Sequence, residues 1–181
     1  MDLKGKKVLV FGAGKSGIGA ADLLGSVGAQ PIIYDGNENL DKEAVLHKTN
    51  GTYTPEIWAG AFPEGEMESL DLVVLSPGVP TDLPLVKSFY EKGLPVWSEV
   101  ELAYRTGKGE VLAITGTNGK TTTTALLGKI MGDARESVFV VGNIGTAYTS
   151  KSLEMREDSV TVAEISSFQL ETIEQFRPKV S

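Results

Sequence analysis

Cysteine is absent from the 181-residue sequence, and histidine occurs once, as His47. Without thiols the chain can form no disulfide scaffold, no cysteine nucleophile and no thiolate metal site. The single histidine lies in a polar stretch, and we expect it on the surface. The lack of cysteine is compatible with a cytoplasmic location, which is the one we expect.

Long apolar runs and positive charge are also scarce. The apolar runs are only a few residues long, whereas a membrane-spanning helix needs about 20, and no signal-peptide pattern follows the first residues. Seventeen Lys and Arg face 24 Asp and Glu, for a net charge of −7. We therefore expect neither nucleic-acid binding nor membrane insertion. A loop or a helix terminus can still bind phosphate in such a protein.

The residues that are present alternate between short apolar runs and helical patterns. The expected strands are 8–11, 31–34, 72–75, 96–97, 111–115, 138–141 and 160–165. The expected helices are 18–27, 83–92, 99–104 and 120–131, and the stretch 37–68 reads as loop with short elements. Strands separated by helices predict βαβ units, and therefore an α/β fold with parallel sheets.

The alternation breaks at Gly107 and Gly109 and then restarts, so we place a domain boundary near residue 108. The predicted domains, 1–108 and 109–181, begin alike, with a strand that enters a glycine loop and a helix. This arrangement recurs in phosphate sites because backbone N–H groups and the helix dipole both attract anions.

The first glycine loop, Gly-Ala-Gly-Lys-Ser-Gly at 12–17, fits the dinucleotide pattern G-x-G-x-x-G. Asp35 ends the next strand, where an acid can accept hydrogen bonds from a nucleotide. The loop alone suggests NAD but cannot name the nucleotide, and a tightly packed turn is the alternative. Ser76-Pro77-Gly78 follows another strand and reads, by itself, as a turn.

The second loop, Thr-Gly-Thr-Asn-Gly-Lys-Thr-Thr at 115–122, is the sharpest motif. Lys120 is expected to reach the β- and γ-phosphates of a nucleotide, and the Thr121 hydroxyl to ligate Mg²⁺. The loop is a shortened variant, because Ile114 stands where the usual P-loop has glycine. Glu164, at the end of a later strand, is the candidate carboxylate for Mg²⁺, with a surface glutamate as the alternative.

Together these residues resemble the Mur ligase family over essentially the whole chain. The second loop is similar to the ATP loop of the whole family, which includes folylpolyglutamate synthetase. The narrower signals are 12–17 with Asp35, 76–78, 98–102, 142–145 and Glu-Ile-Ser-Ser-Phe-Gln-Leu-Glu at 164–171. The last of these favours the members that add D-glutamate over their sister ligases.

The resemblance implies a Rossmann-like N-terminal domain that binds the UDP part of UDP-MurNAc-L-Ala. Ser16 and the loop amides would face the diphosphate, Asp35 and Gly36 would lie near the uracil, and Asn143 would contact the sugar–diphosphate. The implied substrate-binding residues are Gly14, Lys15, Ser16, Gly17, Asp35, Gly36, Ser76, Gly78, Asn143, Ser166 and Gln169.

The resemblance also implies that residues 109–181 are the first part of a P-loop-type ATPase domain. Lys120 and Glu164 would be catalytic, and Thr121 and Glu164 would hold Mg²⁺. The implied ATP-binding residues are Gly116, Thr117, Asn118, Gly119, Lys120, Thr121 and Thr122. The implied reaction is ATP-driven amide formation with D-glutamate through an acyl phosphate.

Such ligases have three domains and more than twice this length, so we expect the chain to be an N-terminal fragment that is inactive alone. The implied role lies in peptidoglycan synthesis, hence in cell shape and division. Two other classes stay open: an NAD-dependent Rossmann oxidoreductase, and a nucleotide-binding module without catalysis. A sister Mur ligase is a milder alternative, disfavoured by Phe168-Gln169.

Overall fold

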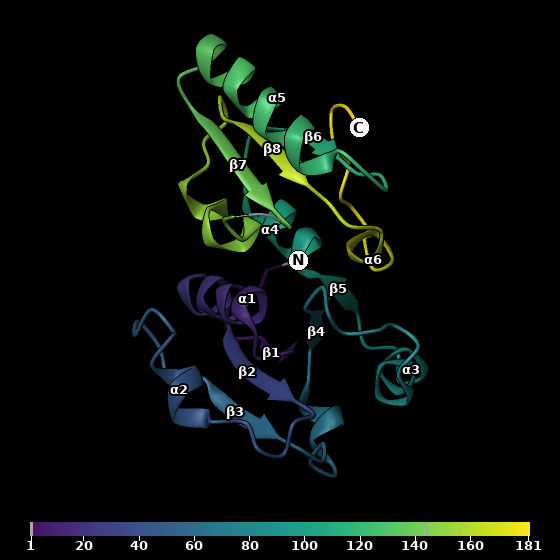
Figure 1. Cartoon of the computed structure of the whole chain (residues 1–181). Helices are drawn as coiled ribbons and strands as arrows, with labels where there is room; N and C mark the ends of the chain where they lie inside the picture. Colours follow the sequence, from purple (N-terminus) through teal and green to yellow (C-terminus); the bar gives the residue numbers. More distant parts are fainter. Residues whose placement is uncertain (1, 144) are drawn as a thin grey trace. The chain divides into compact units, whose positions relative to one another are not determined.

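The computed structural model describes residues 2–143 and 145–181 (Figure 1). Ile144, within the glycine turn expected at 142–145, lies outside the described residues. The chain forms two compact units that divide between Glu99 and Val100. Each unit has its own sheet and is described by itself.

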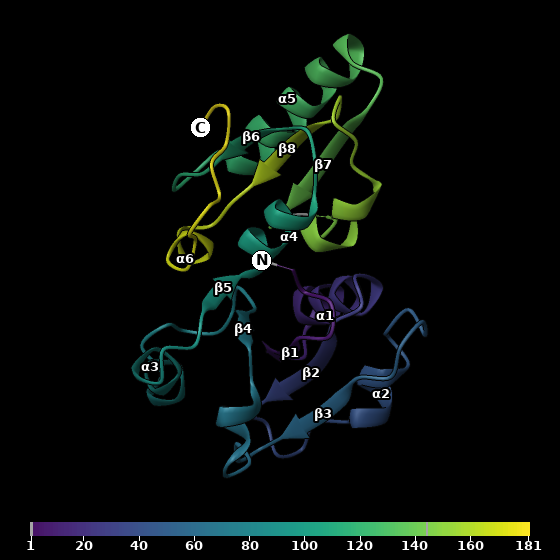
Figure 2. The same cartoon turned by 180° about the vertical axis from the view of Figure 1, so that it is seen from behind.

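The first unit is built on a sheet of five parallel strands in the order β3-β2-β1-β4-β5 (Figures 1 and 2). The strands are β1 (Lys7–Phe11), β2 (Gln30–Asp35), β3 (Glu56–Ala59), β4 (Leu72–Leu75) and β5 (Val96–Ser98). Successive strands are added on one side of β1 and then on the other, so the order reverses between β1 and β4. In open parallel sheets ligands bind at the carboxyl ends of the strands beside such a reversal.

Helices cover both faces of this sheet, which explains why its strands are almost entirely apolar. The helical elements are α1 (Lys15–Ser26), α2 (Lys42–Leu46), η1 (Glu66–Ser69) and α3 (Pro84–Glu91). Leu9 packs on one face with Val86 and Phe89 of α3, in the same core cluster. Val8 and Val10 point to the opposite face because side chains alternate along a strand, and both are fully buried.

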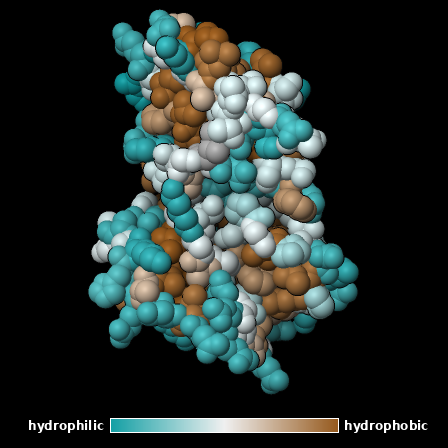
Figure 3. Space-filling model, viewed as in Figure 1, coloured by the Kyte–Doolittle hydropathy of each residue, from teal (hydrophilic) through white to brown (hydrophobic). Residues whose placement is uncertain are grey.

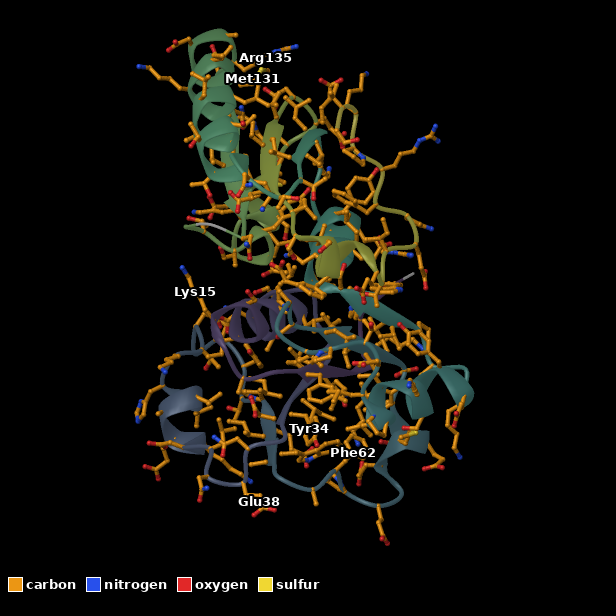
Figure 4. The ribbon with its side chains drawn as sticks, turned by 45° about the vertical axis from the view of Figure 1, so that its right-hand side comes forward. Lys15, Tyr34, Glu38, Phe62, Met131 and Arg135 are labelled. Carbon is orange, nitrogen blue, oxygen red and sulfur yellow. The ribbon has the colours of Figure 1, made fainter. Side chains whose placement is uncertain are left out.

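An aromatic cluster fixes the chain that follows β2 and β3. The rings of Tyr34 and Phe62 meet edge to face with their centroids 5.4 Å apart, and they lie together in Figure 4. The Tyr34 hydroxyl donates to the carbonyl of Gly60 at 3.0 Å, so this buried polar group has its partner. The cluster anchors the loop after β3 against the sheet.

The second unit has three parallel strands in the order β6-β8-β7. They are β6 (Glu110–Ile114), β7 (Val138–Gly142) and β8 (Val160–Glu164). The helical elements are α4 (Glu99–Thr106), α5 (Lys120–Ala134), η2 (Tyr148–Ser150), η3 (Ser152–Glu154) and α6 (Ser167–Leu170). The central strand β8 is buried along its whole length, as expected of a strand paired on both sides.

The strands and longer helices expected from the sequence are present, with ends that shift by a few residues. The expected loop region 37–68 holds α2, β3 and η1, whereas α6 was not anticipated. The division between the units also lies nine residues before the expected 108. The reason is that α4 contributes Val100 and Ala103 to the core of the second unit, together with Tyr148 and Phe176.

The surface of the second unit carries apolar side chains over α5 and β7 (Figure 3). Leu126 and Ile130 of α5 and Val140 of β7 are among the exposed large apolar residues. Within the described part of the chain, no helix combines the length and the apolar character that crossing a bilayer requires.

Replacement of Gly17 by alanine is expected to destabilise the first unit, because a Cβ there would collide with the carbonyl oxygen of Gly12. Overpacking of this kind lowers the free energy of unfolding by about 3 kcal/mol. Urea denaturation, followed by the fluorescence of Trp58 and Trp97, measures it, since both tryptophans lie in this unit.

Gly14→Ala is the matched control, because nothing lies within 4 Å of the position that the new Cβ would take, and φ at Gly14 is −77°. Because Gly14 is a helix N-cap, its replacement by alanine should lower the free energy of unfolding by less than about 1 kcal/mol. Equal losses for the two variants would contradict the packing derived for Gly17.

Candidate functional site

The first glycine loop lies at the reversal point of the five-stranded sheet. The Gly12 N–H donates to the carbonyl of Tyr34 at 2.7 Å, and the Ser76 N–H donates to the carbonyl of Phe11 at 3.0 Å. The Ser76 hydroxyl donates to the carbonyl of Gly12 at 3.3 Å. The loop at 12–17 and Ser76 therefore lie side by side, so Ser76 belongs to this edge and is more than an isolated turn.

The start of α1 gives this loop its capacity to bind an anion. Gly14 is the N-cap, and since glycine has no side chain, it cannot cap the helix through a side-chain bond. The first N–H groups of a helix have no partners within the helix. These donors, with the helix dipole, favour a phosphate. An open pocket of about 440 Å³ adjoins this turn and is lined by Ala13, Gly14, Lys15, Ile18, Gly19, Asp22 and Lys48.

Lys48 is a member of this pocket that the sequence did not reveal. It follows α2 in a stretch without clear periodicity, so no motif marked it as close to the first loop. Lys15, by contrast, was expected there, and Figure 4 shows its side chain at the start of α1. The two lysines add positive charge to the rim of the pocket.

Asp35 orders the loop through its carboxylate. One oxygen accepts the Ala13 N–H at 3.0 Å and the other accepts the Asn37 N–H at 3.0 Å. The sequence predicts that this acid binds a nucleotide. In the structure its carboxylate also holds the loop and its own turn. Gly36 follows it directly, and Gly78 lies in the turn after Ser76, where no atom lies within 4 Å of the position that a Cβ would take.

The second glycine loop joins β6 to α5. Gly116 and Gly119 have φ values of +134° and +77°, which other residues rarely adopt, so this tight turn requires glycine at both positions. The Lys120 ammonium donates to the carbonyl of Gly116 at 2.6 Å and so lies over the loop. The first turn of α5, with Thr121 and Thr122, presents further N–H groups at the same place.

Glu164 meets Thr121 at the end of the second sheet. The Thr121 hydroxyl donates to a Glu164 carboxylate oxygen at 2.9 Å, and the glutamate is only 2% exposed. Ile114, the last residue of β6, is in register with Glu164 on β8, which explains how the loop and the acid come together. The alternative of a surface glutamate is thereby excluded.

A hydroxyl and a carboxylate are the oxygen donors that Mg²⁺ prefers, and this cation usually keeps waters and phosphate oxygens as its other ligands. The pair of the exposed Thr121 and the buried Glu164 therefore fits Mg²⁺ held jointly with a nucleotide. Within residues 2–143 and 145–181, no group of three or more His, Cys, Asp or Glu side chains could hold a metal ion.

Asn143, Ser166 and Gln169 lie near the same strand ends. The Asn143 N–H donates to the carbonyl of Glu164 at 2.9 Å. Ser166 is the N-cap of α6 and forms a capping box with Gln169, whose side chain accepts the Ser166 N–H at 2.9 Å. The sequence marked these polar groups for ligand binding, but it did not reveal this local bond between two of them.

The structure thus gathers the expected residues into two sets, one in each unit. The first set is Gly14, Lys15, Ser16, Gly17, Asp35, Gly36, Ser76 and Gly78, at the carboxyl ends of β1, β2 and β4. The second set is Gly116, Thr117, Asn118, Gly119, Lys120, Thr121, Thr122, Asn143, Glu164, Ser166 and Gln169, at the carboxyl ends of β6, β7 and β8.

Comparison with known families gives two matches. Residues 6–98 match the model of the Mur ligase MurD-like N-terminal domain, and residues 114–181 match that of the Mur ligase middle domain. The first match ends beside the division between the two compact units.

Two similar curated proteins carry the name UDP-N-acetylmuramoylalanine–D-glutamate ligase. The one from Lachnospira eligens is 59% identical over 181 residues, and the one from Lachnoclostridium phytofermentans is 56% identical over 181 residues. In both cases the match covers 100% of this chain but 40% of the relative. The chain therefore spans well under half the length of these proteins.

Among solved structures, a murein peptide ligase from Psychrobacter arcticus is similar with a TM-score of 0.56. It is 20% identical, and the match covers 96% of this chain and 42% of that one. At this identity the likeness supports the α/β fold alone.

The bonds of Asp35 predict the effect of Asp35→Asn on the first unit. An amide has one acceptor oxygen, so one of the two N–H groups of Ala13 and Asn37 loses its partner. The expected loss is about 1 kcal/mol in the free energy of unfolding, measured by urea denaturation.

Asp41→Asn is the control for this substitution. Asp41 caps α2 by accepting the Ala44 N–H, and asparagine caps a helix equally well. Its unfolding midpoint should match that of the unchanged chain. A similar loss in both variants would show that the two bonds of Asp35 carry no special weight.

Proposed function

The chain belongs to the Mur ligase family, and we propose that its protein joins D-glutamate to UDP-MurNAc-L-Ala in an ATP-dependent reaction. The names of its similar curated relatives and their identity of up to 59% support this substrate pair. The product is a peptidoglycan precursor, so the protein would act in the cytoplasm and serve cell-wall growth, cell shape and division.

The first unit would bind the uridine diphosphate part of the substrate. The N–H groups of Gly14 to Gly17 and the Ser16 hydroxyl would hold the diphosphate at the start of α1. The edge where the uridine lies would be shaped by Asp35, Gly36, Ser76 and Gly78. Asp35 would act through the loop that it orders. The dinucleotide fingerprint would thus serve a uridine nucleotide.

The second unit would bind ATP at the loop 116–122. Lys120 would leave the Gly116 carbonyl and neutralise the β- and γ-phosphates, because a charge-assisted bond to phosphate is stronger than one to a neutral carbonyl. Thr121 and Glu164 would hold Mg²⁺, which neutralises phosphate charge during phosphoryl transfer.

The proposed reaction has two steps. A carboxylate oxygen of the substrate attacks the γ-phosphorus of ATP, so that a P–O bond forms, ADP leaves and an acyl phosphate results. The amine of D-glutamate then attacks the acyl carbon, loses a proton and expels phosphate, which leaves an amide. Lys120 and the loop N–H groups hold the transferred group in line and stabilise its charge.

The observation that carries the proposal is the bond between Thr121 and Glu164 directly behind the Lys120 loop. An NAD-dependent oxidoreductase would leave this second site without a role.

Lys120→Ala should weaken ATP binding by the chain. Loss of a charge-assisted bond of about 2 kcal/mol corresponds to roughly 30-fold in Kd. Calorimetric titration with ATP and Mg²⁺ measures this change. Lys129→Ala removes an exposed lysine from the same helix, α5, and should leave the affinity within about twofold. Equal changes in Kd for the two variants would show that ATP binding responds to the net charge of the chain, and they would contradict a place for Lys120 in the site.

Glu164→Gln should abolish the dependence of ATP affinity on Mg²⁺, because an amide is a poor substitute for an anionic ligand. The unchanged chain should bind ATP at least about tenfold more tightly with Mg²⁺ than with EDTA, whereas the variant should bind it equally in both. The affinity in EDTA serves as the internal control for folding. A variant that keeps the full Mg²⁺ effect would exclude Glu164 as the ligand.

A further inference from the structure

Glu101 of α4 is a fully buried carboxylate that holds a distant piece of chain. One oxygen accepts the Gln175 N–H at 2.9 Å, and the other accepts the N–H groups of Glu174 and Phe176 at 3.1 and 2.8 Å. Arg105, one turn further along α4, forms an ion pair with Glu101 and reaches Glu174 with its other nitrogen. Three consecutive N–H groups thus converge on one carboxylate.

The charge of Glu101 is part of this arrangement. Burial alone raises the pKa of the Glu101 carboxyl, but Arg105 and the N–H groups of 174–176 outweigh it and hold that pKa below its ordinary value. The carboxylate is therefore ionised at neutral pH, and its partners stabilise the ionised form. An apolar side chain of the same size could pack there but could not accept these N–H groups.

The segment held by Glu101 leads directly away from the candidate site. It starts at Ile165, whose N–H donates to the Ile114 carbonyl at 2.8 Å, and its far end is the Glu101 anchor at 174–176. Between these two fixed points lie α6 and the Ser166–Gln169 capping box. A short helix of four residues has little stability by itself, so its position depends on the contacts that hold it. These are its two fixed ends and the packing of Leu170 and Ile173 against the core of the second unit.

We propose that Glu101 is a positioning residue that sets the Ser166–Gln169 turn in place for the sugar–peptide portion of the substrate. The assignment rests on the proposed function, since it takes UDP-MurNAc-L-Ala as the ligand. It gives a role to the acidic motif at 98–102, which the nucleotide loops leave unexplained. Glu101 itself touches no substrate and acts through the backbone of 174–176.

The test compares Glu101→Gln with the unchanged chain in two titrations, one with UDP-MurNAc-L-Ala and one with ATP and Mg²⁺. We expect Kd for UDP-MurNAc-L-Ala to rise about tenfold, which corresponds to the contribution of about one hydrogen bond made by the turn. Kd for ATP should stay within about twofold, because the 116–122 loop is not attached to Glu101. A general loss of structure would weaken both ligands together.

Glu174→Gln is the matched control, since it removes the exposed acid on Arg105 but keeps Glu101 and the three N–H groups. Its affinities should equal those of the unchanged chain. An unaltered Kd for UDP-MurNAc-L-Ala in Glu101→Gln, or equal losses for both ligands, would overturn the positioning role. Failure of the unchanged chain itself to bind UDP-MurNAc-L-Ala would instead count against the proposed function.

If Glu101→Gln does not fold, Arg105→Lys replaces it as the test. This variant alters the ion pair of Glu101 but keeps the carboxylate and the backbone N–H groups that it accepts. Amide hydrogen exchange then reports the coupling. Exchange should accelerate at 174–176 and also at Ser166 and Gln169, whose N–H groups bond within the capping box. Acceleration confined to 174–176 would show that the anchor does not reach the turn.

Discussion

In both units a parallel strand ends in a glycine loop, and a helix begins directly after the loop at the carboxyl edge of the sheet. The first N–H groups of each helix have no hydrogen-bond partners within that helix. These donors attract anions regardless of the net charge, so an acidic protein of −7 can bind nucleotides. The remaining features of each site position this turn or add to its charge. Asp35 holds the first loop through the Ala13 N–H, and Lys120 lies over the second.

The two turns share a geometry but differ in the side chains around them. The first turn has Ser76 packed against it, and its acid, Asp35, bonds backbone N–H groups. The second has Glu164 in register with the end of β6, bonded to Thr121. This pair suits a cation that accompanies a nucleoside triphosphate, whereas the first turn, in the proposed function, would supply only N–H donors to a diphosphate. Under the proposed function, two turns of the same geometry would therefore bind two different nucleotides.

Much of this could be predicted from the sequence, for identifiable physical reasons. Strands such as Leu72–Leu75 are runs of buried apolar residues, and glycines with positive φ mark the loops, so the parallel sheets and both turns follow from local patterns. The contacts between segments that are distant in the sequence do not follow from local patterns. Lys48 beside α1 has no local signal. The motif at 98–102 marks Glu101, but nothing local indicates that its carboxylate accepts the N–H groups of 174–176, and the division at Glu99 depends on which core α4 joins.

We propose that one chain binds a uridine nucleotide and ATP at separate sites. The direct measurement is a calorimetric titration of the chain with UDP, performed without and with saturating ATP and Mg²⁺, and repeated with NADH as competitor. We expect UDP still to bind in a one-to-one ratio when ATP is saturating, and NADH not to displace it. Displacement of UDP by ATP would contradict two sites, and displacement by NADH would favour a dinucleotide fold of the oxidoreductase type.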